Sequence, residues 1–270
     1  MHPIEHLRYV ARAHGVDPAA LVEETAHALG SMHFDPAGLV VAARRIVERH
    51  PFTGPLWWLC ANVTTSSEPF ESVWELADAI RSDRTASELA AALPDDADVV
   101  TIGDPSVIGD GLARRGDVRV LALDVDHSAT SFVRRLERSD VDYEPVDAGA
   151  AGSATRVAEV VLIEALAMDA DRVVVPSGSS TIAAAAFAWG TPVWLVAGVG
   201  RRLPSGYVDA MVARREEIAA QIDDWSIDVE VVPTRLITDV IGPHGRTPMG
   251  PPAAQAECPL AAELLRRSAM

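Results

Sequence analysis

The sequence predicts an α/β protein in which an N-terminal helical domain is followed by a mainly parallel, doubly wound sheet. Up to about Leu93 apolar residues recur at helical spacing, whereas after Pro94 short β-branched runs alternate with helical stretches. Most of these runs are continuous stretches of valine, isoleucine and leucine, as is typical of parallel strands that helices cover on both faces. Because crossovers between parallel strands are right-handed, the second half is predicted to be Rossmann-like.

The helices of the first half are marked by their start signals. Apolar residues at positions 4, 7, 10 and 11 form one helical stripe. Asp17-Pro18 and Asp35-Pro36 each place an N-cap residue before a proline at the first helical position, and so predict the second and third helices. Two further helices are predicted over residues 68–81 and 82–93.

The second half is predicted to contain six strands with helices between them. The predicted strands are residues 98–102, 118–124, 141–146, 172–176, 192–197 and 227–232. The predicted helices are residues 106–115, 129–139, 153–168, 179–189 and 207–222. From about Gly242 the chain is rich in proline, glycine and alanine, which is typical of a mobile tail. We therefore divide the chain into a helical domain (1–93), a Rossmann-like domain (94–242) and a flexible tail (243–270).

The charge composition excludes several classes of function. The chain has 270 residues with a formal net charge of −16, and all 23 of its basic residues are arginine. Without lysine the protein cannot form a lysine Schiff base, anchor pyridoxal phosphate or build a Walker-type phosphate loop. The excess of acidic residues also argues against DNA, RNA or an anionic membrane as the main partner.

The sequence shows no zinc motif, no cofactor motif and no membrane span. Cys60 and Cys258 lie far apart without the spacing of a zinc site, and Cys60 stands in an apolar stripe where a buried thiol is expected. The longest apolar stretch, residues 181–200, is broken by Gly190 and Pro192. The N-terminus lacks the apolar run of a signal peptide. We expect a cytoplasmic protein that uses no cofactor and no metal.

Candidate binding residues follow the predicted strands, because ligands of such sheets bind beyond the carboxyl ends of the strands. The fourth predicted strand is followed by a small loop made of Ser177, Gly178, Ser179 and Ser180. Its backbone N–H groups can bind an anion, or else Ser179 or Ser180 simply caps the next helix. Arg201 and Arg202 follow another strand and can clamp a phosphate or a carboxylate, or instead pair with surface acids.

Acidic residues follow the first two strands. Asp104 can act as a base or accept a hydrogen bond from a ligand hydroxyl, although solvated loop acids are common. Asp124, Asp126, His127 and Ser128 form the densest polar cluster. Carboxylates so close together can share a proton or bind a divalent cation, and His127 can act as a general acid or base. The alternative is an aspartate that caps the next helix.

Five segments resemble, in the same order, the motifs of one protein family. They are residues 49–56 (Arg-His-Pro-Phe-Thr-Gly-Pro-Leu), 99–106 (Val-Val-Thr-Ile-Gly-Asp-Pro-Ser), 121–127 (Leu-Ala-Leu-Asp-Val-Asp-His), 170–179 (Ala-Asp-Arg-Val-Val-Val-Pro-Ser-Gly-Ser) and 231–241 (Val-Val-Pro-Thr-Arg-Leu-Ile-Thr-Asp-Val-Ile). Together they resemble the initiation factor 2B family. That family includes the alpha, beta and delta subunits of the eukaryotic exchange factor and the isomerases of methylthioribose-1-phosphate and ribose-1,5-bisphosphate. The resemblance implies a helical domain joined to a Rossmann-like domain, and a homodimer formed through the latter.

The residues that carry the chemistry of the isomerases differ here. By the resemblance, Gly103 stands where the isomerases have a cysteine, and Ser179 where they have an aspartate. Asp126 and His50 stand where they have arginines, although Arg49 can replace one of these. An aldose–ketose isomerisation needs an acid/base pair at the first two carbons of the sugar. Gly103 cannot supply one half of that pair, and Ser179 is a poor replacement for the other.

We therefore expect a protein that resembles the sugar-phosphate isomerases and has altered or absent isomerase activity. It would bind a small sugar-phosphate- or nucleotide-like ligand in the cleft at the carboxyl ends of the strands. The alternative is a non-catalytic regulatory or protein-binding subunit. The candidate catalytic residues are Asp104, Asp124, Asp126, His127 and Ser179. The candidate ligand-binding residues are His50, Thr53, Gly103, Ser177, Gly178, Ser180, Arg201 and Arg202.

Overall fold

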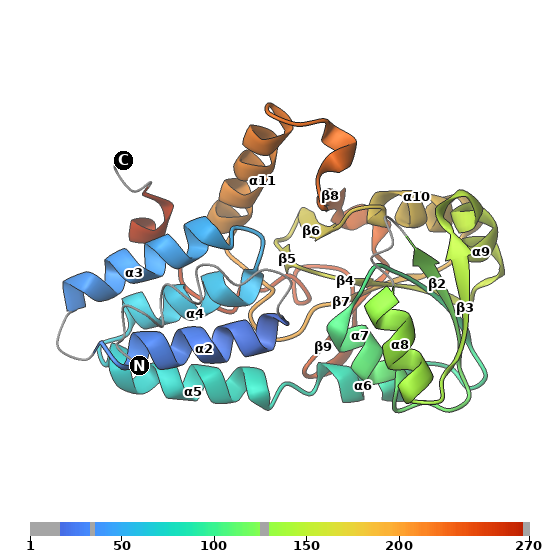
Figure 1. Cartoon of the computed structure of the whole chain (residues 1–270), viewed down its shortest axis with the longest axis horizontal. Helices are drawn as coiled ribbons and strands as arrows, with labels where there is room; N and C mark the ends of the chain where they lie inside the picture. Colours follow the sequence, from blue (N-terminus) through green and yellow to red (C-terminus); the bar gives the residue numbers. More distant parts are fainter. Residues whose placement is uncertain (1–16, 33–35, 125–129, 267–270) are drawn as a thin grey trace.

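The structure is a computed structural model, and it describes residues 17–32, 36–124 and 130–266. Figure 1 shows a group of helices on one side and a sheet with its covering helices on the other. Among the described helices none combines the length and the hydropathy that a membrane span needs. The division into separate domains near Pro94 stays a prediction.

The helical half is built around one buried helix. Its helices are α2 (Pro18–Gly30), α3 (Pro36–Arg49), α4 (Gly54–Thr65) and α5 (Pro69–Arg81), and α6 (Thr85–Ala92) leads to the sheet. Asp17 caps α2 as predicted, since its carboxylate accepts hydrogen bonds from the N–H groups of Ala19 and Ala20. Nearly every residue from Gly54 to Val63 is buried, because α4 packs against α2, α3 and α5.

The main sheet has seven strands in the order β10-β9-β7-β4-β1-β2-β3. All neighbouring pairs are parallel except β9 and β10. The strands are β1 (Asp98–Ile102), β2 (Arg119–Asp124), β3 (Asp142–Asp147), β4 (Val160–Glu164), β7 (Val193–Val196), β9 (Asp239–Gly242) and β10 (Gly245–Pro248). The mainly parallel α/β fold predicted from the sequence is therefore confirmed.

Helices cover both faces of this sheet, as the continuous apolar strands indicated. Neighbouring residues of β1 show the alternation, because Val99 packs into the core on one face and Val100 into the core on the other. The core of one face includes side chains of α6, α7 (Ser106–Leu112) and α8 (Thr130–Arg138). The core of the other face includes side chains of α9 (Ala151–Val157) and α10 (Ser179–Trp189).

The helix predicted over residues 153–168 was wrong. Only α9 is helical there, and the chain then forms β4, which pairs with β1 and β7 in the middle of the sheet. The run Val160-Val161-Leu162-Ile163 prefers a strand, but alanine and glutamate on both sides gave the segment a helical composition. As a consequence, Glu164 stands at the carboxyl end of a central strand.

Two of the predicted strands belong to a second, smaller sheet. β5 (Ala167–Met168), β6 (Arg172–Pro176) and β8 (Val229–Pro233) form an antiparallel sheet in the order β5-β6-β8. Between β7 and β8 the helix α11 (Ser205–Ala219) projects from the body (Figure 1). The loop after β6 therefore follows a strand of the small sheet.

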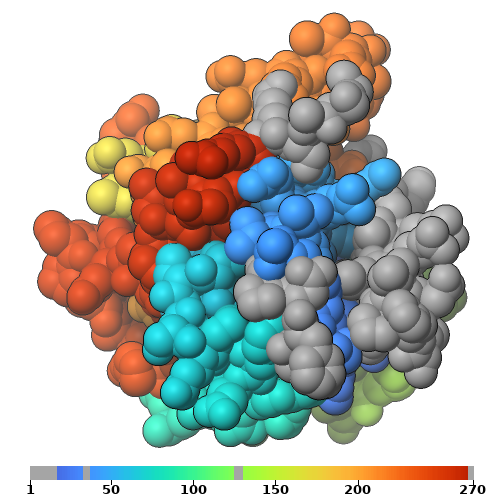
Figure 2. Space-filling model, turned by 90° about the vertical axis from the view of Figure 1, so that its left-hand side faces the viewer, coloured from blue at the N-terminus to red at the C-terminus, as the bar shows by residue number. Residues whose placement is uncertain are grey.

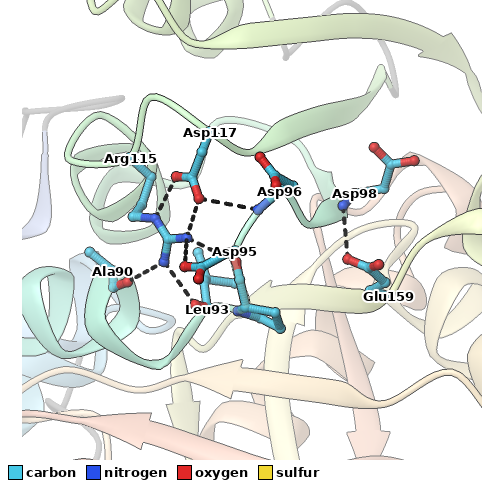
Figure 3. A network of polar contacts seen from close by, with 9 residues as sticks. Ala90, Leu93, Asp95, Asp96, Asp98, Arg115, Asp117 and Glu159 are labelled. Atoms are coloured by element: carbon cyan, nitrogen blue, oxygen red, sulfur yellow. Dashed lines mark hydrogen bonds and ion pairs between the residues drawn. The ribbon is translucent and has the colours of Figure 1, made fainter.

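The connection from the helices to the sheet is held by Arg115. Its Nη1 donates hydrogen bonds to the carbonyl oxygens of Ala90 and Leu93, at 2.8 and 2.7 Å, where α6 ends. The Asp117 carboxylate accepts from Nε and Nη2 of Arg115 and from the N–H of Asp96 (Figure 3). The Arg115 guanidinium holds the pKa of Asp117 well below its usual range. These contacts fix the position at which β1 begins.

The segment predicted as a flexible tail is packed as far as Arg266. Glu257 accepts hydrogen bonds from the N–H of Gly200 and from Arg202, so it joins this segment to the loop after β7. The side chains of Ala261 and Leu264 are buried against the helical half. In Figure 2 the C-terminal segment, in red, lies against α3, in blue. Proline and glycine here mark an irregular path over the surface, and buried apolar side chains hold it in place.

Candidate ligand-binding site

A cleft of about 310 Å³ lies between the helical half and the sheet. Its walls come from the starts of α2 and α4, the end of α5, the start of α7 and the loop after β7. The segments that follow β1 and β7 both reach it, so it lies at the carboxyl edge of the parallel strands. Ligands of doubly wound sheets bind at this edge.

A buried ion pair lies at this edge. Nη2 of Arg201, which lines the cleft, is 3.0 Å from Oε1 of Glu164, and the two side chains are only 6% and 8% exposed. Oε2 of Glu164 accepts hydrogen bonds from the N–H groups of Val107 and Ile108, at 2.9 and 3.1 Å. Oε1 also accepts one from the Ser106 hydroxyl at 3.3 Å. Glu164 therefore joins β4, the first turn of α7 and the loop after β7.

Arg201 has unused hydrogen-bonding capacity. Its Nη1 is buried and finds no acceptor among the described residues. A buried donor without an acceptor costs about 1–3 kcal/mol. Arg201 is itself part of the cleft lining.

The rest of the lining is rich in carboxylates that already have structural contacts. Four carboxylates and two guanidinium groups line the cleft: Asp17, Glu23, Asp83, Asp110, Arg81 and Arg201. Glu23 pairs with Arg81 at 3.0 Å. Asp83 accepts hydrogen bonds from the N–H groups of Thr85 and Val199, both at 2.9 Å, and thereby links α6 to the loop after β7. These acids build the walls of the cleft.

Asp104 and Gly103 follow β1 beside the ion pair. Burial raises the pKa of Asp104, and the negative charge of Glu164 adds to the effect, while Arg135 at 3.4 Å opposes it. Asp104 thus lies near enough to Glu164 to interact with it. Gly103 has a φ of +74°, a conformation that favours glycine, so it serves the turn that ends β1.

The acidic cluster after β2 is only partly described. Asp124 ends β2 and lines a separate depression with Arg134 and Glu137. Asp126, His127 and Ser128 lie outside the described residues. The predicted grouping of these four residues therefore stays a prediction.

The serine loop after β6 does not line the cleft. Gly178 adopts a φ of +85° and precedes α10, and neither Ser179 nor Ser180 caps the helix with its hydroxyl. Instead the N–H of Ser180 donates to the Glu230 carboxylate at 2.8 Å. The Ser179 hydroxyl is buried and has no partner among the described residues. Ser177 donates its N–H to the Asp228 carbonyl, which ties the loop to the start of β8.

The two arginines after β7 have different roles. Arg201 belongs to the cleft, whereas Arg202 donates from Nε and Nη2 to Oε1 of Glu257, at 2.9 and 2.5 Å. Arg202 therefore pairs with an acidic side chain of the protein and does not reach the cleft. Both guanidinium groups pair with a carboxylate, and Nη1 of Arg201 is left buried without an acceptor among the described residues.

His50 and Thr53 precede α4, and neither side chain is part of the cleft lining. The N–H of Thr53 donates to the His50 carbonyl, which forms the turn before the helix. The next residue, Gly54, donates its N–H to the Leu166 carbonyl, and a Cβ at Gly54 would come within 2.3 Å of that oxygen. Pro55 then lines the cleft. Close contact with the segment after β4 thus places the start of α4.

Sequence reasoning missed Glu164 and Asp83. Glu164 is an acidic residue at the end of an apolar run, which is also the pattern that makes Asp124 a candidate. The run before Glu164 was predicted to be part of a helix, so Glu164 was not recognised as a strand-end residue. Asp83 stands just before Thr85 at the start of α6, where the sequence suggests a cap and gives no sign of the bond to Val199.

Comparisons with known proteins identify the architecture. The structure resembles the Pyrococcus horikoshii OT3 translation initiation factor eIF-2B with a TM-score of 0.75 and 18% identity, over 94% of this chain and 98% of that chain. The eIF2B-beta2-delta2 tetramer from C. thermophilum matches with a TM-score of 0.70 and 14% identity, over 91% and 90%. The 5-methylthioribose 1-phosphate isomerase of P. horikoshii OT3 matches with 0.65 and 13%, over 93% and 85%.

The sequence itself gives no such match: no family model fits it, and a search of curated proteins found no relative. At identities this low the structural likeness shows the fold. The architecture implied by the resemblance of the sequence motifs is confirmed over nearly the whole chain. The protein has the fold that the initiation factor 2B subunits share with 5-methylthioribose 1-phosphate isomerase.

Proposed function

We propose that this protein binds a small, hydroxyl-bearing, sugar-like molecule in the cleft between its two halves, and that it has lost aldose–ketose isomerase activity. The observation that carries the proposal is Nη1 of Arg201, a buried donor without an acceptor among the described residues. A ligand oxygen at that position would satisfy the donor. The cleft volume of about 310 Å³ suits a molecule of the size of a sugar.

The loss of isomerase activity is proposed from the chemistry around the cleft. Isomerisation needs two groups that exchange protons with neighbouring carbons. Gly103 has no side chain to offer, and the Ser179 hydroxyl lies buried at the start of α10. Asp104, whose pKa is raised, suits one half of such a pair. Asp17 and Asp83, which line the cleft, are already engaged in capping helices.

A thermal-shift screen tests ligand binding. The screen compares unphosphorylated sugars, polyols and nucleosides with their phosphorylated forms, on the wild type and on Arg201→Met. A ligand at a hundred times its dissociation constant stabilises the folded state by about 2.7 kcal/mol. We expect a shift for the wild type that Arg201→Met abolishes.

Arg202→Met is the matched control, because it removes the neighbouring arginine, which pairs with Glu257 outside the lining of the cleft. It should lower the melting temperature and keep the ligand-induced shift. An equal shift in wild type and Arg201→Met, or no shift with any compound, would refute the proposed site. Assays with methylthioribose-1-phosphate and ribose-1,5-bisphosphate should give no product above the uncatalysed rate.

A second candidate function is that of a non-catalytic subunit that binds another protein chain. The observation that favours it is the exposure of three large apolar side chains on the neighbouring helices α9 and α10: Val157, Phe187 and Trp189, which are 57%, 70% and 58% exposed. Exposed apolar side chains that gather on a surface are typical of interaction sites. The resemblance implies a homodimer through this half of the protein, and we propose a second copy of the chain as the occupant of this face. A cytoplasmic location stays a prediction from the sequence.

A further inference from the structure

The guanidinium of Arg201 is already neutralised from within the protein. Its Nη2 pairs with Glu164, and both side chains are more than nine-tenths buried. We propose that Glu164 makes the cleft select ligands that carry no phosphate group, because it supplies the anion that Arg201 would otherwise take from the ligand. This inference rests on the proposed function and names the chemical class of the ligand.

The carboxylate of Glu164 is fixed in place. One oxygen faces Arg201 and the other accepts from the N–H groups of Val107 and Ile108. If the side chain moved away to admit a ligand phosphate, two amide donors and one guanidinium nitrogen would lose their acceptor together. Glu164 therefore stays in the site when a ligand binds.

The remaining donor of Arg201 suits one neutral oxygen. An arginine grips a phosphate best through two parallel N–H···O bonds from neighbouring nitrogens. Here Nη2 is shared with Glu164, so a phosphate that used both nitrogens would place its charge directly beside a carboxylate. A single hydroxyl or carbonyl oxygen can accept from Nη1 without that repulsion.

The other charged side chains of the cleft also disfavour a ligand phosphate. Arg81, the second guanidinium of the lining, pairs with Glu23 and Asp78, each at 3.0 Å. Asp83 and Asp110 add further negative charge. Since both arginines of the lining are paired, the field of the cleft opposes a phosphate dianion and admits an uncharged polyhydroxylated molecule.

Inorganic phosphate is the probe that tests this role of Glu164. The wild type, Glu164→Gln and Asp110→Asn are titrated with phosphate against chloride at constant ionic strength, and the melting temperature is followed. Asp110→Asn is the matched control, because it removes one negative charge from the same cleft without freeing Arg201. We expect a saturable shift for Glu164→Gln, with an apparent affinity at least tenfold above that of the other two proteins. The shift should disappear in the double variant Glu164→Gln/Arg201→Met.

Phosphate binding by the wild type that Arg201→Met abolishes would overturn the inference. A folded Glu164→Gln variant without phosphate binding would do the same. If Glu164→Gln unfolds in plain buffer, its refolding is compared in phosphate and in chloride: recovery in phosphate alone supports the inference, and failure in both contradicts it. A gain of phosphate binding by Glu164→Gln alongside a negative sugar screen would reject the proposed ligand and keep the role of Glu164.

Discussion

The buried pair of Glu164 and Arg201 should couple the stability of the two sides of the cleft. Each charge has lost its water, and removing one partner leaves the other buried without compensation. Such a loss costs about 3–5 kcal/mol. Glu164→Gln keeps a carbonyl oxygen that can serve an amide of α7, so we expect about 3 kcal/mol for it and slightly more for Arg201→Met.

The double variant distinguishes an ion pair from two independent packing sites. With both charges gone, no uncompensated charge remains, so the double variant should be at least about 2 kcal/mol more stable than the sum of the single losses predicts. Urea unfolding measures these differences. With an m-value of about 3 kcal/mol/M, a loss of 3 kcal/mol lowers the midpoint by about 1 M.

The exposed pair of Glu23 and Arg81 is the control for this cycle. Its nitrogen–oxygen distance is also 3.0 Å, but its side chains are 38% and 57% exposed. Its coupling should stay below about 1 kcal/mol. If each single substitution at Glu164 or Arg201 lowered the free energy of unfolding by less than about 1 kcal/mol, the two side chains would not form a stabilising buried ion pair. Strict additivity in the double variant would contradict the ion pair as well.

Four further predictions concern other parts of the molecule. Arg115→Met should lower stability by about 3 kcal/mol in urea unfolding, because the carbonyl oxygens at the end of α6 lose their donor; a change below 1 kcal/mol would contradict this. Folding raises the pKa of Asp104, so the folded state binds the proton of this carboxyl more tightly than the unfolded state and loses stability as the pH rises. Asp104→Asn should therefore raise the melting temperature at pH 7 and leave it unchanged below pH 3.8. A lower melting temperature at pH 7 would contradict burial as the cause of the raised pKa. Burial raises the pKa of both Cys60 and Cys258 to about 12, so iodoacetamide at pH 8 should label neither thiol until the protein unfolds, as mass spectrometry would show; rapid labelling of the folded protein would contradict their burial. Phe187→Glu should convert a dimer to monomers in sedimentation, and a wild type that is already monomeric would exclude this interface.

Much of the fold could be predicted from local signals. The Asp17-Pro18 cap and the helical spacing of apolar residues located α2, α3, α5 and α6, whereas α4 was not predicted as a helix. Runs of β-branched and apolar residues located β1, β2 and β7, and β3 was located in spite of its mixed composition. These signals act within a few residues of the chain, so the sequence displays them directly. β4 was not predicted because the residues before and after it in the sequence favour a helix. Its pairing with β1 and β7 in the sheet decides that it is a strand.

The site could be predicted less well because it depends on which strands become neighbours. Arg201 was identified from its position after a strand, but its charge partner Glu164 comes from the strand that was missed. Ser179 follows a true strand, yet local sequence does not say that this strand belongs to the small antiparallel sheet. The segment from Gly245 to Arg266 has the composition of a tail, and only the folded chain provides the surface that buries Ala261.

The most direct test is a crystal structure of the protein with the compound that gives the largest thermal shift. We expect the compound to occupy the cleft and one of its uncharged oxygens to accept a hydrogen bond from Nη1 of Arg201. Glu164 should keep its contacts with Arg201 and α7. A compound bound beside Asp124 or the Ser177–Ser180 loop, or a phosphate group seated on Arg201, would contradict this expectation.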